Sequence, residues 1–148
     1  VAVSFGGGIL AISLFRLAFR PPPPRPTIPT VAILLAPPGL LFLAWVQLNG
    51  GEIDPLARGF FYVGLVLTLV LIGWVPRFAA APFSLAWWAY TFPVVAIATA
   101  AMQFHRLVAG DAFAVIAAAY FALANAVVLI VLCRSAIALF CGRLFPPD

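Results

Sequence analysis

Charged residues are scarce in this chain, at 8% of 148 residues. A soluble domain carries about 25%. The eight basic residues are all arginine, and four acids leave a net charge of +4. These arginines are scattered singly, and the sequence contains neither a basic run nor a nucleic-acid-binding motif. The composition therefore excludes an ordinary soluble domain, and we expect no nucleic-acid partner.

Side chains that carry catalytic chemistry are equally rare. The chain has one histidine and two cysteines, and no acidic residue lies inside a long apolar run. It has no Ser-His-Asp set, no metal-ligand spacing and no phosphate-binding loop. Cys133 and Cys141 are expected to be free thiols, because eight residues along one helix separate them too far for a disulfide. We expect no enzyme, no metal site and no cofactor.

Apolar residues are what the chain has in excess: 66% are hydrophobic, and the mean hydropathy is +1.18. This predicts an all-α integral membrane protein, because helices satisfy their own backbone groups in lipid. The chain begins with Val1 inside an apolar run, so we expect residues 1–148 to be one membrane domain and a fragment of a larger protein. Five transmembrane helices are predicted, at about 1–19, 30–48, 59–75, 84–104 and 112–134, and the last could continue for two turns.

Prolines divide the predicted spans into two kinds. The segment RPPPPRPTIP, Arg20–Pro29, cannot be helical and predicts a stiff connector. Pro37 and Pro38 interrupt the second span and Pro93 interrupts the fourth, so these helices should be kinked. The third and fifth spans contain no proline.

The two proline-containing spans also match each other. An offset of 56 residues places Pro37 on Pro93 and Gln47 on Gln103, and each span is followed by a straight one. This favours a repeated hairpin of one kinked and one straight helix. Lipid cannot satisfy backbone groups freed by proline, so we expect kinked helices inside the bundle, lining a path.

Small and weakly polar residues recur at helical spacing on both kinked spans. Phe92 stands directly before Pro93 and is the one large ring in these stripes, so it could plug a narrow pore. Spacing alone leaves simple helix packing open as well, with Phe92 in a core. Asn125, the polar residue deep in the last span, favours an interhelical hydrogen bond. The predicted pore-lining residues are Ile33, Ala36, Leu40, Ala44 and Gln47 on one helix, and Ala89, Ala96, Thr99 and Gln103 on the other.

The arginines are distributed unevenly between the two ends of the spans. Six of them fall on one side, and Arg58 and Arg106 fall on the other with the acids of the loops. The positive-inside rule makes the first side cytoplasmic. The C-terminus is then cytoplasmic too. The six are Arg16, Arg20, Arg25, Arg77, Arg134 and Arg143.

Four segments together resemble one family. They are LLAPPG from Leu34, IDPLAR from Ile53, FSLAWWAYTFP from Phe83 and the closing LFPPD. The sequence is similar in these to the slow (S-type) anion channels and to the bacterial TehA tellurite-resistance and C4-dicarboxylate transporters. Yeast sulfite and malate transporters belong to the same broader family.

The resemblance implies ten helices, arranged as five hairpins around a central pore, in a homotrimer. This chain would supply helices six to ten, and the N-terminal helices of the same protein would be its partners. Phe92 falls on the family's pore-occluding phenylalanine. The implied function is a passive channel for nitrate-type or chloride-type anions in the plasma membrane.

Two alternatives remain open from the sequence. The first is a secondary transporter or exporter of sulfite, malate, tellurite or a similar anion. Proton coupling usually needs a buried titratable group, which these spans lack and the missing half could hold. The second is a membrane module that transports nothing and scaffolds a larger complex.

Overall fold

A computed structural model describes residues 8, 12, 15, 31–80 and 82–141 of the chain. The predicted first span and the proline-rich connector lie outside these residues, apart from three isolated positions in the span. The described part is all-α, as predicted, with helices joined by turns. Four of its helices are long and apolar enough to cross a membrane: Val31–Leu48, Pro55–Ile72, Leu85–Leu107 and Asp111–Phe140.

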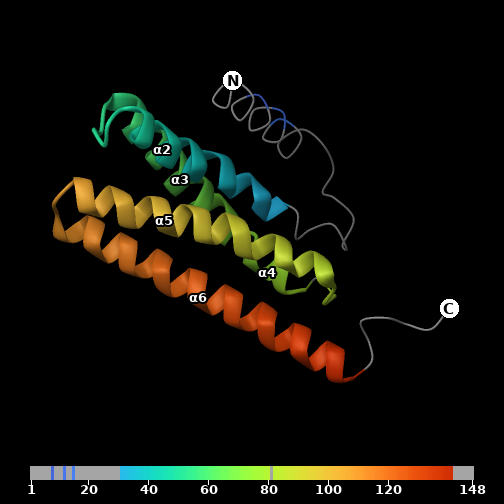
Figure 1. Cartoon of the computed structure of the whole chain (residues 1–148). Helices are drawn as coiled ribbons and strands as arrows, with labels where there is room; N and C mark the ends of the chain where they lie inside the picture. Colours follow the sequence, from blue (N-terminus) through green and yellow to red (C-terminus); the bar gives the residue numbers. More distant parts are fainter. Residues whose placement is uncertain (1–7, 9–11, 13–14, 16–30, 81, 142–148) are drawn as a thin grey trace.

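The helices follow one another with short connections (Figure 1). The elements are α2 (Ala36–Leu48), α3 (Pro55–Ile72), the short α4 (Val75–Ala79), the 3-10 helix η2 (Leu85–Tyr90), α5 (Thr91–Leu107) and α6 (Asp111–Phe140). α3 begins four residues earlier than the predicted span because Asp54 caps it: its carboxylate accepts a 2.8 Å hydrogen bond from the Ala57 N–H. α6 runs six residues past 134, through the first part of the tail.

The prolines mark a change of helix type. Residues 31–35 form a 3-10 turn before α2, and η2 forms one before α5. Pro37 and Pro93 follow within the first turn of each α-helix, where a missing N–H costs no intrahelical bond. The irregularity expected in the middle of each span is therefore a junction between a 3-10 turn and an α-helix.

α5 is the centre of the described bundle and contacts α2, α3 and α6. α2 and α5 run side by side in the same direction, α3 lies behind them, and α6 follows the other side of α5 (Figure 1). The contact of α2 with α5 is close because Gly39 has no side chain: a Cβ there would lie 3.2 Å from the Ala96 carbonyl.

Phenylalanines fill the space between α2, α3 and α5. The rings of Phe61 and Phe104 stack with centroids 4.0 Å apart, and Phe42 lies 5.8 Å from both. All three are fully buried. A second buried contact is polar: the Tyr120 hydroxyl donates to Thr68 Oγ1 at 2.7 Å, and Thr68 donates to the Gly64 carbonyl at 2.8 Å. This chain of hydrogen bonds ties α6 to α3.

The loop between α2 and α3 is closed by one side-chain pair. The Trp45 indole N–H lies 3.1 and 3.0 Å from the two Asp54 carboxylate oxygens. Gly50 and Gly51 make the turn between them with φ of 67° and 91°, values that favour glycine. The resulting hairpin is fixed at its loop as well as along its helices.

Candidate pore-lining face

One side of the α2–α5 pair is uncovered within the described part of the chain. On this side Phe92, Val95 and Thr99 are exposed on α5. We call these residues, together with their neighbours on α2, the open face. Its α2 members, counting the 3-10 turn before the helix, are Ile33, Leu40, Ala44 and Gln47, all exposed.

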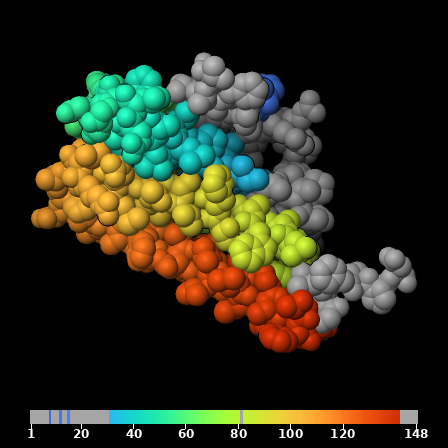
Figure 2. Space-filling model, viewed as in Figure 1, coloured from blue at the N-terminus to red at the C-terminus, as the bar shows by residue number. Residues whose placement is uncertain are grey.

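The two halves of the open face point the same way. Gly39 and Ala96 mark the line where α2 and α5 touch, and the back of both helices is covered by α3 around Gly64. A position opposite that back must therefore lie on the front of each helix. Figure 2 shows α2 and α5 side by side on one surface of the molecule, with α6 beside them.

Six of the ten predicted stripe residues lie on this face, and four do not. Phe92 has 59% of its surface exposed. Ala36 and Ala96 are instead buried, at 3% and 6% exposure, and Ala96 lies in the contact with Gly39. Ala89 and Gln103 are half-buried at the two ends of the α5 stripe.

Val95 lies on the open face but is absent from the predicted stripe. Its side chain is 44% exposed. It stands three residues after Phe92 and four before Thr99, so the same helical spacing could have found it. The prediction selected small residues and therefore passed over Val95. The exposed surface is more apolar than the predicted stripe.

The open face presents no charged side chain. The Thr99 hydroxyl donates to the Val95 carbonyl at 2.9 Å, and the Thr91 hydroxyl donates to the Trp88 carbonyl at 2.8 Å. The Thr99 hydroxyl is thus satisfied within α5, and the Thr91 hydroxyl, beside the open face, is satisfied across the junction of η2 and α5. Such a face can hold back an ion by its shape and by removing its water. In the described part of the chain, no group of three or more His, Cys, Asp or Glu residues could hold a metal.

One polar residue outside the open face, Asn125, does not make the predicted interhelical hydrogen bond. Asn125 is exposed on α6, and its side-chain amide donates at 2.8 Å to the Phe121 carbonyl of the same helix. The expected interhelical hydrogen bond is therefore replaced by one within α6. Cys133 and Cys141 are free, as predicted, and both are exposed.

The fold and the open face define a class: an all-α, multi-pass membrane protein with two broken helices packed side by side. The family model described as voltage-dependent anion channel, SLAC1, matches residues 1–136. The chain belongs to this family, which confirms the resemblance seen in its sequence.

Individual relatives agree with the family. The chain is 30% identical over 142 residues, or 95% of its length, to the S-type anion channel SLAH2 of Arabidopsis thaliana. It is 28% identical over 142 residues to SLAH3, and 30% identical over 87 residues, or 59% of its length, to the guard cell channel SLAC1 of the same plant. It spans only 27%, 22% and 16% of SLAH2, SLAH3 and SLAC1, respectively.

Proposed function

We propose that this chain forms the C-terminal part of the membrane domain of a passive anion channel. α2 and α5 would line the pore with the open face, and Phe92 would occlude it. The observation that carries the proposal is the position of Phe92: the residue is 59% exposed on an uncharged face that presents no other aromatic ring, next to a buried proline. A packed core phenylalanine would instead be covered, as Phe104 is.

Selectivity follows from the chemistry of the open face. An anion that enters an uncharged, narrow passage must lose water, and no cation on this face offsets that loss. Weakly hydrated anions lose least, so nitrate should pass more readily than chloride. Peptide dipoles at the starts of α2 and α5 would add a modest positive potential.

The remaining parts of the pore would come from other chain segments. No described helix covers the open face, which fits a pore completed by N-terminal helices of the same protein. The assembled protein would be a homotrimer, as the family resemblance implies. Residues 1–148 alone should then insert into a bilayer but conduct no anion. The C-terminus would lie in the cytoplasm, an orientation that the arginine asymmetry supports.

The test is the Phe92→Ala variant of the full-length protein under voltage clamp, at matched surface expression. Removing the ring should raise the anion current several-fold. The matched control is Phe121→Ala, because Phe121 is 54% exposed on α6 and lies outside the open face. Tyr90 is a poor control because it is buried against Trp87 and Phe78. An unchanged current in Phe92→Ala would refute the gate.

The same recordings separate a channel from a coupled carrier. The reversal potential of a channel follows the anion gradient alone, whereas that of a proton-coupled carrier shifts when pH changes on one side. A pH-dependent shift would favour the transporter of sulfite, malate or tellurite. Absence of any anion flux from the full-length protein would favour the scaffold.

A further inference from the structure

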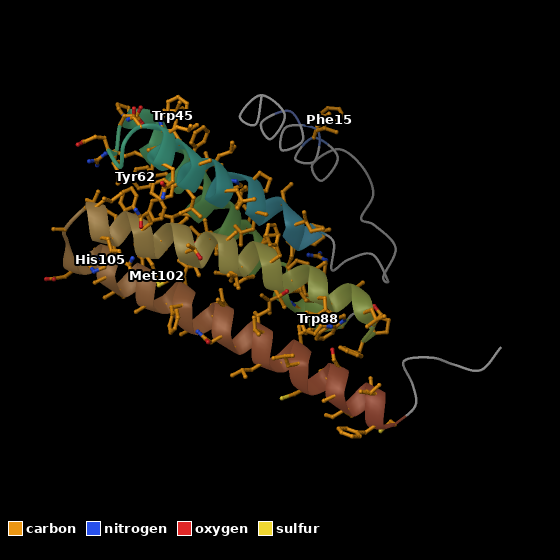
Figure 3. All side chains as sticks on the ribbon, viewed as in Figure 1. Phe15, Trp45, Tyr62, Trp88, Met102 and His105 are labelled. Carbon is orange, nitrogen blue, oxygen red and sulfur yellow. The ribbon has the colours of Figure 1, made fainter. Side chains whose placement is uncertain are left out.

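The two broken helices terminate at the same end of the bundle, beside the hairpin loops 49–54 and 108–110. We call this end the loop end, and Figure 3 shows Trp45 of α2 and His105 of α5 there. Because α2 and α5 run in the same direction, both present their C-terminal carbonyl groups at the loop end. Such carbonyl groups carry a partial negative charge, so an anion that approaches this end is repelled unless a cation lies nearby.

Arg106 supplies a cation in line with the open face. Phe92, Thr99 and Arg106 follow one another at intervals of seven residues on α5, and seven residues are close to two turns of an α-helix. All three side chains are exposed. Arg106 therefore lies about 10 Å beyond Thr99 on the same side of the helix. The open face stays uncharged along its length, and a guanidinium stands at its loop end.

Two glutamine amides lie at one level just inside Arg106. α2 and α5 touch where Gly39 meets Ala96. Gln47 comes eight residues after Gly39, or about 12 Å, and Gln103 comes seven residues after Ala96, or about 10 Å. Within the described part of the chain, neither amide makes a hydrogen bond. Each NH₂ group therefore has two donors to offer an anion at this level.

α2 and α5 remain packed together near the loop end. The Phe42 ring of α2 lies 5.8 Å from the Phe104 ring of α5, and Phe104 directly follows Gln103 in the sequence. Both rings are fully buried and contact the Phe61 ring of α3, behind the pair. This packing holds the ends of the two helices at a set spacing, so the two amides are positioned by the fold.

The acids of the loop end do not neutralise Arg106. The Asp54 carboxylate already accepts hydrogen bonds from a backbone N–H and from an indole. Glu52 and Asp111 are exposed, and among the described residues neither forms an ion pair with Arg106. Because these three acids share the loop end with two arginines, its overall charge does not attract anions. Attraction must come from Arg106 at short range, which is about 8 Å at physiological salt.

We infer that Gln47, Gln103 and Arg106 form a binding site for small monovalent anions at the loop end of the proposed pore. The guanidinium supplies the charge, and the amides replace part of the water that an anion loses before it meets the uncharged face. A single cation suits nitrate or chloride better than the divalent sulfate. The role of the site rests on the proposed channel, whereas its binding of anions can be measured without any current.

Nitrate currents through the full-length protein test the site. The half-saturating nitrate concentration is measured under voltage clamp, with nitrate supplied from the loop end at constant ionic strength. Arg106→Gln should raise it about fivefold, the effect of one nearby unit charge in water. Arg106→Lys should stay close to the parent, because the charge remains. An unchanged half-saturating concentration in Arg106→Gln would overturn the site.

The matched control is Arg58→Gln. Arg58 is exposed at the same end, but it belongs to α3, which covers the back of the α2–α5 pair. Its substitution should leave the half-saturating nitrate concentration unchanged. An equal shift in both variants would mean a general effect of surface charge and would also overturn the site. The gate is judged separately, by the response of the same current to Phe92→Ala.

A second measurement is independent of conduction. With Cys133 and Cys141 replaced by Ala, Ala44→Cys places a reporter thiol on the open face, one turn of α2 inward from Gln47. A negatively charged methanethiosulfonate reagent should react with this thiol faster than a positively charged one of similar size. Nitrate should slow the negative reagent more than sulfate does at equal ionic strength. Arg106→Gln should abolish both differences.

The two measurements separate failure of the site from failure of the channel. Equal rates for the two reagents, or no protection by nitrate, would refute the site even in a protein that conducts normally. A protein that conducts no anion but shows the charge preference and the protection would keep the site and lose the proposed channel.

Discussion

The two hairpins of this protein are alike in their broken helices and different in their straight ones. α2 and α5 each begin after a 3-10 turn, carry proline in the first α-helical turn and contribute to the open face. Their partners differ: α3 has 18 residues and a side-chain cap, and α6 has 30 residues and none. The two helices that carry the open face share one construction, whereas the two straight helices differ in length and capping.

The broken helices differ in one respect that bears on function. The residue 56 positions before Phe92 is Ala36, and it is buried, whereas Phe92 is exposed. Of the two broken helices, only α5 therefore presents an aromatic ring on the open face. This asymmetry between two similarly built helices is a second observation in favour of the occluding role proposed for Phe92.

The largest expected effect is in thiol labelling, which reports the side of the membrane on which each loop lies. Both hairpin loops should be extracellular, and the α4 region cytoplasmic. With Cys133 and Cys141 replaced by Ala, Glu52→Cys and Ala109→Cys should react fully with an impermeant thiol reagent added to intact cells. Ala79→Cys should react only after lysis. All three sites are exposed. The reverse pattern would overturn the orientation, and opposite results for the two loops would break the hairpin pairing.

The next largest expected effect is the difference in stability lost when each of two phenylalanines of α5 is replaced by alanine. Phe104 is fully buried and stacked on Phe61, so Phe104→Ala should lower the unfolding free energy by about 3–5 kcal/mol. Phe92→Ala should cost about 0.5 kcal/mol or less, as an exposed position does. Thermal melts of the purified protein, followed by circular dichroism, measure both. Equal losses would show that Phe92 is core packing in the assembled protein.

The third prediction concerns the close contact between α2 and α5, which a larger side chain at Gly39 should disrupt. Gly39→Val should destabilise the protein by about 1–3 kcal/mol, because the backbone at Ala96 cannot move away as a flexible side chain would. Ala44→Val adds two methyl groups on the exposed side of the same helix and should have little effect on melting. If the two variants melt alike, the close approach of α2 to α5 is not what holds the pair together.

The smallest expected effect concerns the cap that only the first hairpin has. The Ala57 N–H, and then the Trp45 indole, hydrogen-bond to the Asp54 carboxylate and hold its pKa below the ordinary 3.8. The stability that this carboxylate contributes is therefore present above pH 3.8 and is lost as pH falls through the lowered value. Melting temperatures measured from neutral to acidic pH should fall less steeply in Asp54→Asn than in the parent. Glu52→Gln should match the parent, and a parallel fall in Asp54→Asn would refute the cap.

Much of the architecture follows from the sequence because a bilayer allows few solutions. Apolar runs without charge must be helices there, since unpaired backbone groups cannot face lipid. Pro37 and Pro93 can disrupt a helix only where they stand, so both junctions were predictable near their positions. The segment Phe83–Pro93 was specific enough to indicate the family.

Only the tertiary structure decided which part of each stripe is covered. Helical spacing places Ala96 and Thr99 on one broad face, but the close approach at Gly39 buries Ala96 and leaves Thr99 exposed. A pocket between residues 83–85 and the last turns of α6 could not be predicted from the sequence either, because its two sides come from segments about fifty residues apart. Periodicity reports the direction of a side chain around its own helix, whereas burial depends on which other helix arrives there.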